Sequence, residues 1–296
     1  MQRLSSSVGN TPLIPIRNEN STVWGKAELM NPGGSVKDRM ATYILNDAED
    51  RKLIKKGDTL IEATSGNTGI SFAMLAAERG YKMKIIMPSN MSEERKKIFD
   101  FYGAELIEVG AGDFDGAIEL RDTLAKENDY FNCNQFHNLL NIEAHYKITG
   151  PEIYKNFRKE SGDNSFPDVI IMGTGTGGTI MGVGKFLREI WPIVRIVAVE
   201  PAESPVMSGG ESGLHGIQGI GDGSKFLVDL DFIDEVVTVK TEDAKDRARE
   251  LSKNGIFVGV SSGANVLAAE KWLKDNNKQN AITILCDRGE RYFSCL

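Results

Sequence analysis

The stretch Val169-Ile-Ile-Met-Gly-Thr-Gly-Thr-Gly-Gly-Thr179 decides the fold of this chain. Its first four residues are β-branched or apolar, which is typical of a short strand buried on both faces. A glycine- and threonine-rich turn follows directly, and residues 179–190 then have the apolar spacing of a helix. A buried strand that passes through such a turn into a helix predicts a βαβ unit and therefore a parallel sheet.

The same alternation extends outward on both sides of this stretch. The predicted strands are 59–63, 83–87, 105–109, 169–172, 196–200, 236–239 and 281–285. The predicted helices are 36–50, 67–79, 93–102, 114–127, 179–190, 242–253 and 264–276. Gly80 and Gly103 stand where two of these helices should end, as C-cap glycines do. We therefore expect an α/β fold with mainly parallel sheets flanked by helices.

The composition excludes several classes of protein. Hydrophobic residues make up 41% and charged residues 26% of the 296, with a net charge of −7 and the two signs interspersed. Such a balance argues against nucleic acid as a partner. The N-terminus lacks the apolar segment of a signal peptide, and no apolar run approaches membrane-spanning length. We expect a cytoplasmic protein that does not enter the membrane.

The cysteines and histidines give no sign of a structural bridge or a metal. The three cysteines form no C-x-x-C pair and are too few for a disulfide framework. The three histidines lack the spacing of a metal site. Free thiols and no metal are therefore expected.

The glycine loop after residue 172 has two interpretations. Glycines let backbone N–H groups approach a ligand closely, and the start of a helix adds partial positive charge, which together suit a phosphate. Gly173, Gly175 and Gly178 also satisfy G-x-G-x-x-G, and Glu200 ends a later strand, where a ribose-binding acid would belong. An NAD-dependent dehydrogenase is therefore an alternative.

Two further loops carry candidate chemistry. In Glu62-Ala-Thr-Ser-Gly-Asn-Thr-Gly69, more hydroxyl and amide side chains gather at a helix start than a helix cap requires, and they suit a bound carboxylate. In Asn31-Pro-Gly-Gly-Ser-Val-Lys37, a lysine follows a Pro-Gly-Gly turn at a helix start. The positive end of a helix dipole favours the neutral amine that a Schiff-base lysine needs.

Together these loops resemble the cysteine synthase family of pyridoxal-phosphate (PLP) enzymes. This family has fold type II, is similar to tryptophan synthase β, and includes O-acetylserine sulfhydrylases and cystathionine β-synthases. Further matching segments run nearly end to end along the chain, at 8–13, 87–95, 150–153, 216–221, 259–263 and 289–292.

The resemblance implies a role for each matching residue. Lys37 would carry PLP as a Schiff base and shuttle the α-proton. Asn67 would hydrogen-bond the phenolic oxygen of PLP, and Ser261 would face the pyridine nitrogen without protonating it. The residues implied to hold the phosphate are Gly175, Thr176, Gly177, Gly178 and Thr179. The residues implied to hold the substrate are Thr64, Ser65, Gly66, Thr68, Gln135 and Gly219.

The resemblance also implies a reaction and an architecture. The reaction is β-replacement on a small amino acid, with O-acetylserine and sulfide giving L-cysteine and acetate. A smaller, mobile domain would span 38–141, a larger one would comprise 1–37 and 142–296, and PLP would lie between them. The resemblance implies a homodimer, with serine acetyltransferase as a further candidate partner. A silent relative serving only as a binding partner is disfavoured, because it would not need Lys37, Asn67 and Ser261.

Asp222 departs from the family pattern. In Gly219-Ile-Gly-Asp-Gly223, A-type relatives commonly have a small apolar residue at this position. The aspartate can be a turn residue, or it can be a general base that faces the β-substituent and repels hydrosulfide. The second interpretation predicts a sulfide-releasing cysteine lyase, in which L-cysteine and water give L-serine and sulfide. Segments 35–39 and 286–288 resemble B-type enzymes and 200–205 resembles A-type enzymes, so the subfamily stays open.

Overall fold

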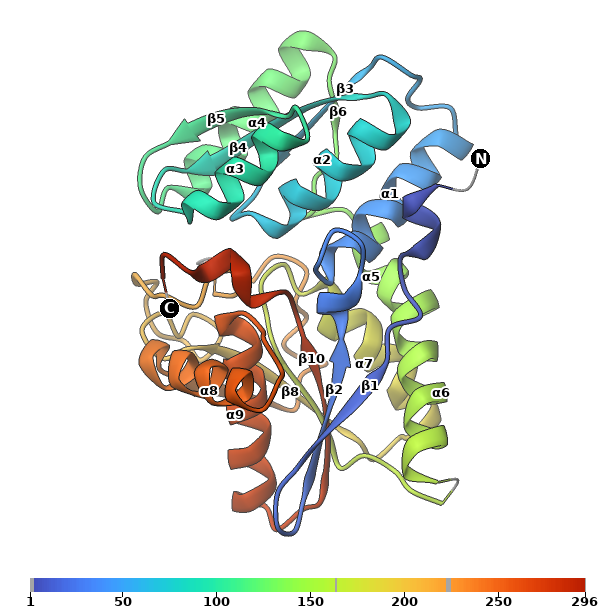
Figure 1. Cartoon of the computed structure of the whole chain (residues 1–296), viewed down its shortest axis with the longest axis vertical. Coiled ribbons are helices and arrows are strands. Elements are labelled where there is room, and N and C mark those ends of the chain that lie inside the picture. The colour runs from blue at the N-terminus through green and yellow to red at the C-terminus, as the bar shows by residue number, and fades with distance from the viewer. Residues whose placement is uncertain (1–2, 163, 222–224, 296) are drawn as a thin grey trace.

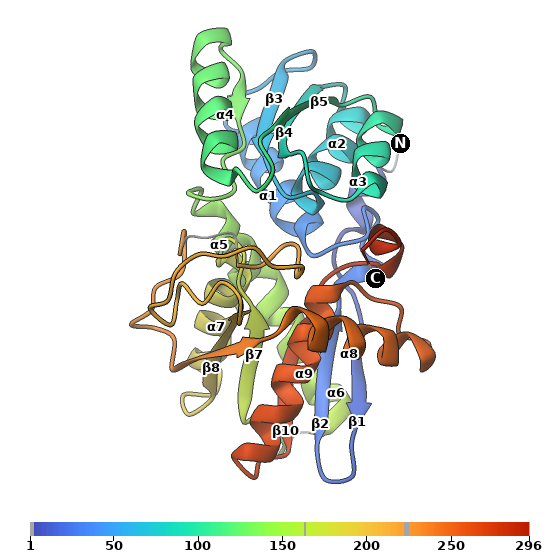
Figure 2. The same ribbon diagram turned by 90° about the vertical axis from the view of Figure 1, so that its left-hand side faces the viewer.

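The computed structural model describes residues 3–162, 164–221 and 225–295. Its chain forms two lobes, each built around one sheet (Figure 1). Figure 2, turned by 90°, places α1 (Lys37–Asp50) and α5 (Leu140–Ala144) at the junction between the lobes. Across the described ranges no helix is both long and apolar enough to span a membrane.

The larger lobe contains a six-stranded sheet with the order β1-β2-β10-β7-β8-β9. Its strands are β1 (Leu13–Arg17), β2 (Thr22–Ala27), β7 (Val169–Gly173), β8 (Arg195–Pro201), β9 (Glu235–Val239) and β10 (Asn280–Leu285). Only the β1–β2 pair is antiparallel among these neighbours. The helices of this lobe are α6 (Gly150–Ser161), α7 (Gly178–Ile190), α8 (Thr241–Lys253) and α9 (Val260–Asp275).

Strand β7 shows why this sheet is covered on both faces. Val169 and Ile171 are fully buried against residues of α8 and α9, whereas Ile170 and Met172 pack against α6 and α7. Successive side chains of a strand point to opposite faces, so an unbroken apolar run requires helices on both sides. The deciding stretch of sequence therefore forms the centre of the larger lobe.

The smaller lobe contains a parallel sheet with the order β5-β4-β3-β6. Its strands are β3 (Thr59–Ala63), β4 (Lys82–Pro88), β5 (Glu105–Val109) and β6 (Phe131–Asn132). Helices α1, α2 (Asn67–Arg79) and α3 (Glu93–Phe101) share one apolar core with this sheet, and α4 (Phe114–Asn128) packs on its other face. After α5, a π-helix (His145–Thr149) leads directly into α6.

The α/β prediction with two mainly parallel sheets is confirmed, and all the predicted strands and helices are present. Helix α9 begins at Val260 rather than at the predicted residue 264, which puts Ser261 in its first turn. The prediction missed β1, β2, β6, α5, the π-helix and α6. Pro15 obscured β1, which tolerates a proline because it is an edge strand.

Candidate active site

A cavity lies between the two lobes, at the ends of β3 and β7 where their chains turn into helices. In open α/β sheets, ligands bind at this edge of the strands. The predicted site residues that line the cavity are Lys37, Ser65, Asn67, Thr68, Gln135, Gly175, Thr176, Gly177, Thr179, Gly219 and Ser261. The structure thus brings together side chains from segments that lie far apart in the sequence.

The predicted residues Thr64, Gly66 and Gly178 do not belong to the cavity lining but lie next to residues that do. The Gly66 N–H donates to Thr64 Oγ1 at 2.9 Å, which holds the substrate loop (residues 62–69) in a tight turn. Gly66 has φ 144°, and a Cβ atom there would lie 2.1 Å from Arg95 Cδ, so no larger residue fits. Gly178 is the first residue of α7. Asp222 lies outside the described residues.

The glycine loop forms a cradle for an anion. Gly177 caps α7 in the left-handed region at φ 89°, and the backbone N–H groups of the first helical turn follow it. The Thr176 and Thr179 side chains also line the cavity, whereas no Asp or Glu belongs to its described lining. Backbone N–H groups, hydroxyls and a helix N-terminus are the donors that a phosphate group takes. This donor set fits the phosphate of PLP.

Lys37 is the first residue of helix α1, and the next residue, Asp38, anchors the first turn through two hydrogen bonds. The Asp38 carboxylate accepts a hydrogen bond from Gly33 N at 2.6 Å and another from the Ser71 hydroxyl at 2.5 Å. Burial raises the pKa of Asp38 to about 6, although the Ser71 hydroxyl and the charge of Arg291 oppose the rise. The start of α1 is therefore tied to the loop before it and to α2.

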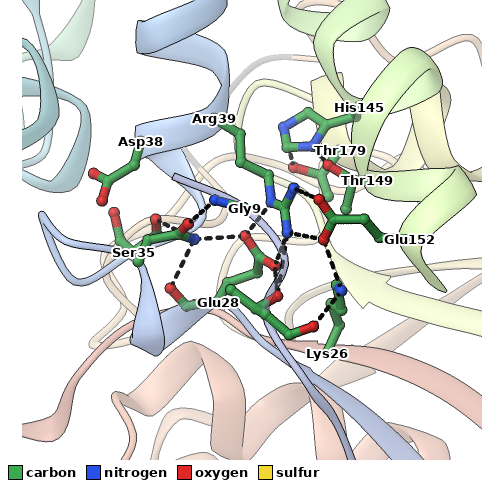
Figure 3. Close-up of polar contacts among 12 residues, drawn as sticks. Gly9, Lys26, Glu28, Ser35, Asp38, Arg39, His145, Thr149, Glu152 and Thr179 are labelled. Carbon is green, nitrogen blue, oxygen red and sulfur yellow. Dashed lines mark hydrogen bonds and ion pairs between the residues drawn. The ribbon is translucent and has the colours of Figure 1, made fainter. Parts of the chain in front are cut away.

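A buried cluster of charged groups lies one residue further along α1 (Figure 3). This Arg39 cluster comprises Thr11, Lys26, Glu28, Arg39 and Glu152. Arg39 Nε and Nη2 lie 2.5 and 2.8 Å from the Glu28 carboxylate, and Nη1 and Nη2 lie 2.9 and 2.7 Å from that of Glu152. Lys26 Nζ lies 2.9 Å from Glu152 Oε2. Burial opposes ionisation of Glu152, but Arg39 and Lys26 outweigh it and lower its pKa to about 2.

The substrate loop is held by Gln135. The Thr68 hydroxyl donates to Gln135 Oε1 at 2.6 Å, and Gln135 Nε2 donates to the Ala63 carbonyl at 2.8 Å. The Gln135 N–H in turn donates to Glu62 Oε2 at 2.9 Å, and Glu62 forms a buried ion pair with Arg121 at 3.1 Å. Thr68 and Gln135, two of the residues predicted to bind a carboxylate, are therefore joined by a direct hydrogen bond.

Ser261 faces the cavity from the first turn of α9. The N-terminus of a helix carries partial positive charge, which disfavours a second positive charge beside it. The neighbouring Cys286 thiol stays neutral, because burial and the charge of Asp287 raise its pKa to about 11. A pyridine nitrogen at this wall would meet neutral groups among the described residues, which fits the ring of PLP as an unprotonated pyridine.

A second buried cluster, which the sequence interpretation did not anticipate, closes the cavity. This Arg95 cluster comprises Ser65, Asn67, Arg95, Asp287 and Tyr292. Asn67 Nδ2 and the Tyr292 hydroxyl donate to Asp287 Oδ2 at 2.7 and 2.6 Å. Arg95 Nη2 donates to the Tyr292 hydroxyl at 2.7 Å, and Nη1 donates to the Ser65 carbonyl at 3.2 Å. The cluster joins the substrate loop and α3 to the 3-10 helix Gly289–Tyr292.

Glu200 is already bound within its own loop. It is buried, and its carboxylate accepts hydrogen bonds from Met207 N at 2.7 Å, Ser208 N at 2.9 Å and the Ser208 hydroxyl at 2.5 Å. The carboxylate therefore fixes the turn after β8 and is not placed to bind a ribose. The dehydrogenase alternative loses the acid on which it depended.

Comparison with known proteins agrees with the chemistry of the cavity. A family model described as pyridoxal-phosphate dependent enzyme matches residues 4–287. Cysteine synthase B of Campylobacter jejuni is 43% identical over 299 residues, covering 99% of this chain and 97% of that protein. The structure of a cysteine synthase from Entamoeba histolytica superposes with a TM-score of 0.90 at 38% identity, covering 100% of this chain and 90% of that one. A hydrogen sulfide-producing enzyme from Fusobacterium nucleatum superposes with a TM-score of 0.93 at 39% identity, covering 99% and 90%.

Proposed function

This chain belongs to the family of pyridoxal-phosphate-dependent enzymes and uses PLP, and from that premise we propose that it exchanges the β-substituent of a small amino acid as a cysteine synthase does. The observation that carries the proposal is one cavity that Lys37, the hydroxyl-rich substrate loop, the phosphate cradle and Ser261 all line. A dehydrogenase or a simple binding protein would have no use for this set.

The proposed roles follow from the chemistry of each side chain. When bound, PLP supplies an electron sink that acidifies the α-proton of an amino acid and lets the β-substituent leave. Lys37 would hold the cofactor covalently through Nζ and then carry the α-proton. Thr176 and Thr179 would bind the phosphate, and Asn67 would face the phenolic oxygen. The neutral Ser261 would leave the pyridine nitrogen unprotonated, which favours loss of a β-substituent over other outcomes.

The substrate side of the proposed site selects a small amino acid. Ser65, Thr68 and Gln135 would bind its carboxylate, with the Thr64 hydroxyl and the Gly66 turn holding the loop in shape and Gly219 beside its amine. The N-terminus of α2 carries partial positive charge and would attract the substrate carboxylate. The hydroxyl and amide groups of the loop would then supply hydrogen-bond donors to it.

The main proposed reaction joins O-acetylserine and sulfide to give L-cysteine and acetate. The second candidate is release of sulfide from L-cysteine, with water as the nucleophile, L-serine as the product and Asp222 as the base. The likeness to a hydrogen sulfide-producing enzyme at 39% identity favours keeping this candidate. The role of Asp222 depends on the sequence alone.

The test is rapid-scan absorbance of the purified enzyme mixed separately with O-acetylserine and with L-cysteine, with sulfide assayed in parallel. A spectral change with O-acetylserine, followed by cysteine formation on adding sulfide, supports the synthase. Fast sulfide release from cysteine that Asp222→Ala abolishes supports the second candidate. A protein that binds no PLP and responds to neither compound would overturn both, and Lys37→Ala serves as the inactive control.

We also propose how the two domains move and with which chains the enzyme associates. A smaller domain over residues 38–141 would close on a larger one formed by 1–37 and 142–296, within a cytoplasmic homodimer. Serine acetyltransferase is the candidate protein partner. Sedimentation velocity of the enzyme alone and with that acetyltransferase would test both associations, and a monomer that ignores the acetyltransferase would overturn them.

A further inference from the structure

A helical segment behind the phosphate cradle contacts both of its hydroxyl side chains. Asn141 on α5 and His145 at the start of the π-helix lie four residues apart, and both are buried. Asn141 Nδ2 lies 3.0 Å from Thr176 Oγ1, and His145 Nε2 lies 3.2 Å from Thr179 Oγ1. The two threonines line the cavity, whereas Asn141 and His145 do not. These contacts reach the cavity through the threonine hydroxyls, and Asn141 also contacts Gln135, a third residue of the cavity wall.

Two glycines of α7 allow this close approach. A Cβ atom on Gly178 would lie 2.0 Å from Asn141 Oδ1. A Cβ atom on Gly182, one turn later, would lie 2.4 Å from the Ile142 carbonyl oxygen and 2.6 Å from His145 Cβ. Each distance is far below van der Waals contact, so only glycine fits at either place. Both helices are thus built to bring Asn141 and His145 against the cradle.

The hydrogen bonds of Asn141 fix the direction in which the Thr176 hydroxyl donates. Asn141 Nδ2 also donates to the Gln135 carbonyl at 3.1 Å, and because a carbonyl can only accept, this atom must be the amide nitrogen. Thr176 Oγ1 therefore accepts from Asn141, and it accepts from Gly178 N at 3.4 Å as well. With its oxygen engaged twice as an acceptor, the hydroxyl keeps its own proton to donate elsewhere.

The surroundings of His145 bear on the direction in which the Thr179 hydroxyl donates (Figure 3). Burial and the positive charges of Arg39 and Lys37 lower the pKa of His145 well below its usual value, so the ring is neutral and carries one N–H. Its Nδ1 lies 2.8 Å from Thr149 Oγ1, in the same π-helix. We take Thr149 as the donor to Nδ1; in that tautomer the ring proton is on Nε2 and is donated to Thr179 Oγ1.

We propose that Asn141 and His145 are positioning residues that turn the Thr176 and Thr179 hydroxyls into donors toward the phosphate of PLP. The inference rests on the proposed function only in that PLP occupies this cavity. A phosphate dianion offers acceptors alone, so a hydroxyl helps to bind it only when its proton points that way. A hydroxyl whose oxygen is already engaged as an acceptor is oriented before the ligand arrives, which lowers the entropy cost of binding.

The experiment compares PLP with pyridoxal, which lacks the phosphate, on the full chain after its cofactor has been removed. Asn141→Leu and His145→Leu remove the donor, whereas His145→Gln keeps an amide N–H near the position of Nε2. We expect each leucine variant to raise the Kd of PLP by about tenfold or more, as for a lost hydrogen bond to a charged group. The Kd of pyridoxal should be unchanged, and His145→Gln should stay close to the unmodified chain for both ligands. The ³¹P resonance of bound PLP should shift in the leucine variants.

Equal weakening of PLP and pyridoxal would mean a general structural role and would overturn the inference, as would unchanged PLP binding in both leucine variants. If a leucine variant does not fold, Thr149→Val takes its place, because it removes only the partner of Nδ1. It should weaken PLP and spare pyridoxal, and the absence of that contrast counts equally against the inference. Failure of the unmodified chain to bind PLP would instead overturn the proposed function as well, so the two failures are distinguishable.

Discussion

Two buried arginines hold the two lobes together in different ways. In the Arg39 cluster, the guanidinium contacts the carboxylates of Glu28 and Glu152, each through two hydrogen bonds (Figure 3). In the Arg95 cluster, the carboxylate of Asp287 lies 4.0 Å from the guanidinium. Arg95 Nε and Asp287 Oδ1 are buried without a hydrogen-bond partner. The buried side-chain polar atoms of the Arg39 cluster thus all have hydrogen-bond partners, whereas two of those in the Arg95 cluster have none.

The difference has a physical consequence for motion. A buried charge without a full set of partners gains from solvent or from a rearranged neighbour, so a cluster that contains one opens at lower cost. The Arg39 cluster lies where the chain enters α1, at one of the passages between the lobes. The Arg95 cluster joins α3 and the substrate loop to the C-terminal segment. We therefore expect the first junction to act as the fixed side and the second to release when the substrate loop opens.

The largest effect should come from Glu28→Gln at the fixed junction. Removing one charge of a fully buried pair leaves Arg39 undercompensated, which typically destabilises a protein by about 3–5 kcal/mol. Urea unfolding at neutral pH measures the change. The control is Asp47→Asn, whose partner Arg51 is largely exposed and whose loss should cost at most about 0.5 kcal/mol. A similar small loss for Glu28→Gln would end the distinction between the two arginines.

A second test uses pH at Asp38, the residue of α1 next to the fixed junction. The pKa of Asp38 is about 6 in the folded chain and 3.8 ordinarily, so folding favours its protonated form. That stabilisation is fully present below pH 3.8 and is lost as the pH rises through 6. Between about pH 4 and pH 7 the unmodified chain should therefore lose up to about 3 kcal/mol of stability. Asp38→Asn has no such titration, so its stability relative to the unmodified chain should rise by the same amount. Urea unfolding across that range measures the difference, and a difference independent of pH would contradict it.

Arg95→Met should affect binding more than stability. The substitution leaves the Ser65 carbonyl and the Tyr292 hydroxyl without a donor but also removes a buried charge that is only partly satisfied, so the loss of stability should be about 1–2 kcal/mol. The substrate loop loses the bond between the Ser65 carbonyl and Arg95, although Asn67 still bonds Asp287, and the apparent Kd of the amino-acid substrate in a spectral titration should rise about tenfold. Lys97→Met on the exposed side of α3 is the control. A loss as large as that of Glu28→Gln, with unchanged substrate affinity, would make Arg95 a second fixed junction.

The smallest effect belongs to the outer edge of the same junction. Glu94 accepts hydrogen bonds from the Ser294 N–H at 2.9 Å and from its hydroxyl at 2.8 Å, near solvent. Glu94→Gln keeps an acceptor and loses only the charge, so stability should fall by at most about 0.5–1 kcal/mol. Glu93→Gln in the same turn is the matched control for urea unfolding. A larger loss for Glu94→Gln would show that the C-terminal segment contributes more to closure than Arg95 does.

The features that could be predicted from the sequence are those that a run of neighbouring residues determines. Complete local patterns revealed seven of the ten strands of the described ranges and the loops after β3 and β7. Ser261, Gln135 and Gly219 have no such pattern and entered only through the family resemblance. The two arginine clusters were missed, since Arg39 and Glu152 lie 113 residues apart and Arg95 and Tyr292 lie 197 apart. Strand β2 was missed partly because its Lys26 is polar in sequence. The partners of its buried Nζ are the Thr11 carbonyl and the distant Asn156 and Glu152.

The π-helix between α5 and α6 sets the rotation of α5 about the helix axis relative to α6. One extra residue within a helix turns everything before it by about 100° relative to an uninterrupted α-helix. Asn141 can therefore point at the glycine loop while Phe157, further along the same rod, stacks edge-on against Trp24 at 5.6 Å in the core. Deleting a single residue from His145–Thr149 would restore the α-helical register and swing one of those two faces away from its target. We therefore expect insertions and deletions in this rod to be tolerated only in pairs that preserve the phase.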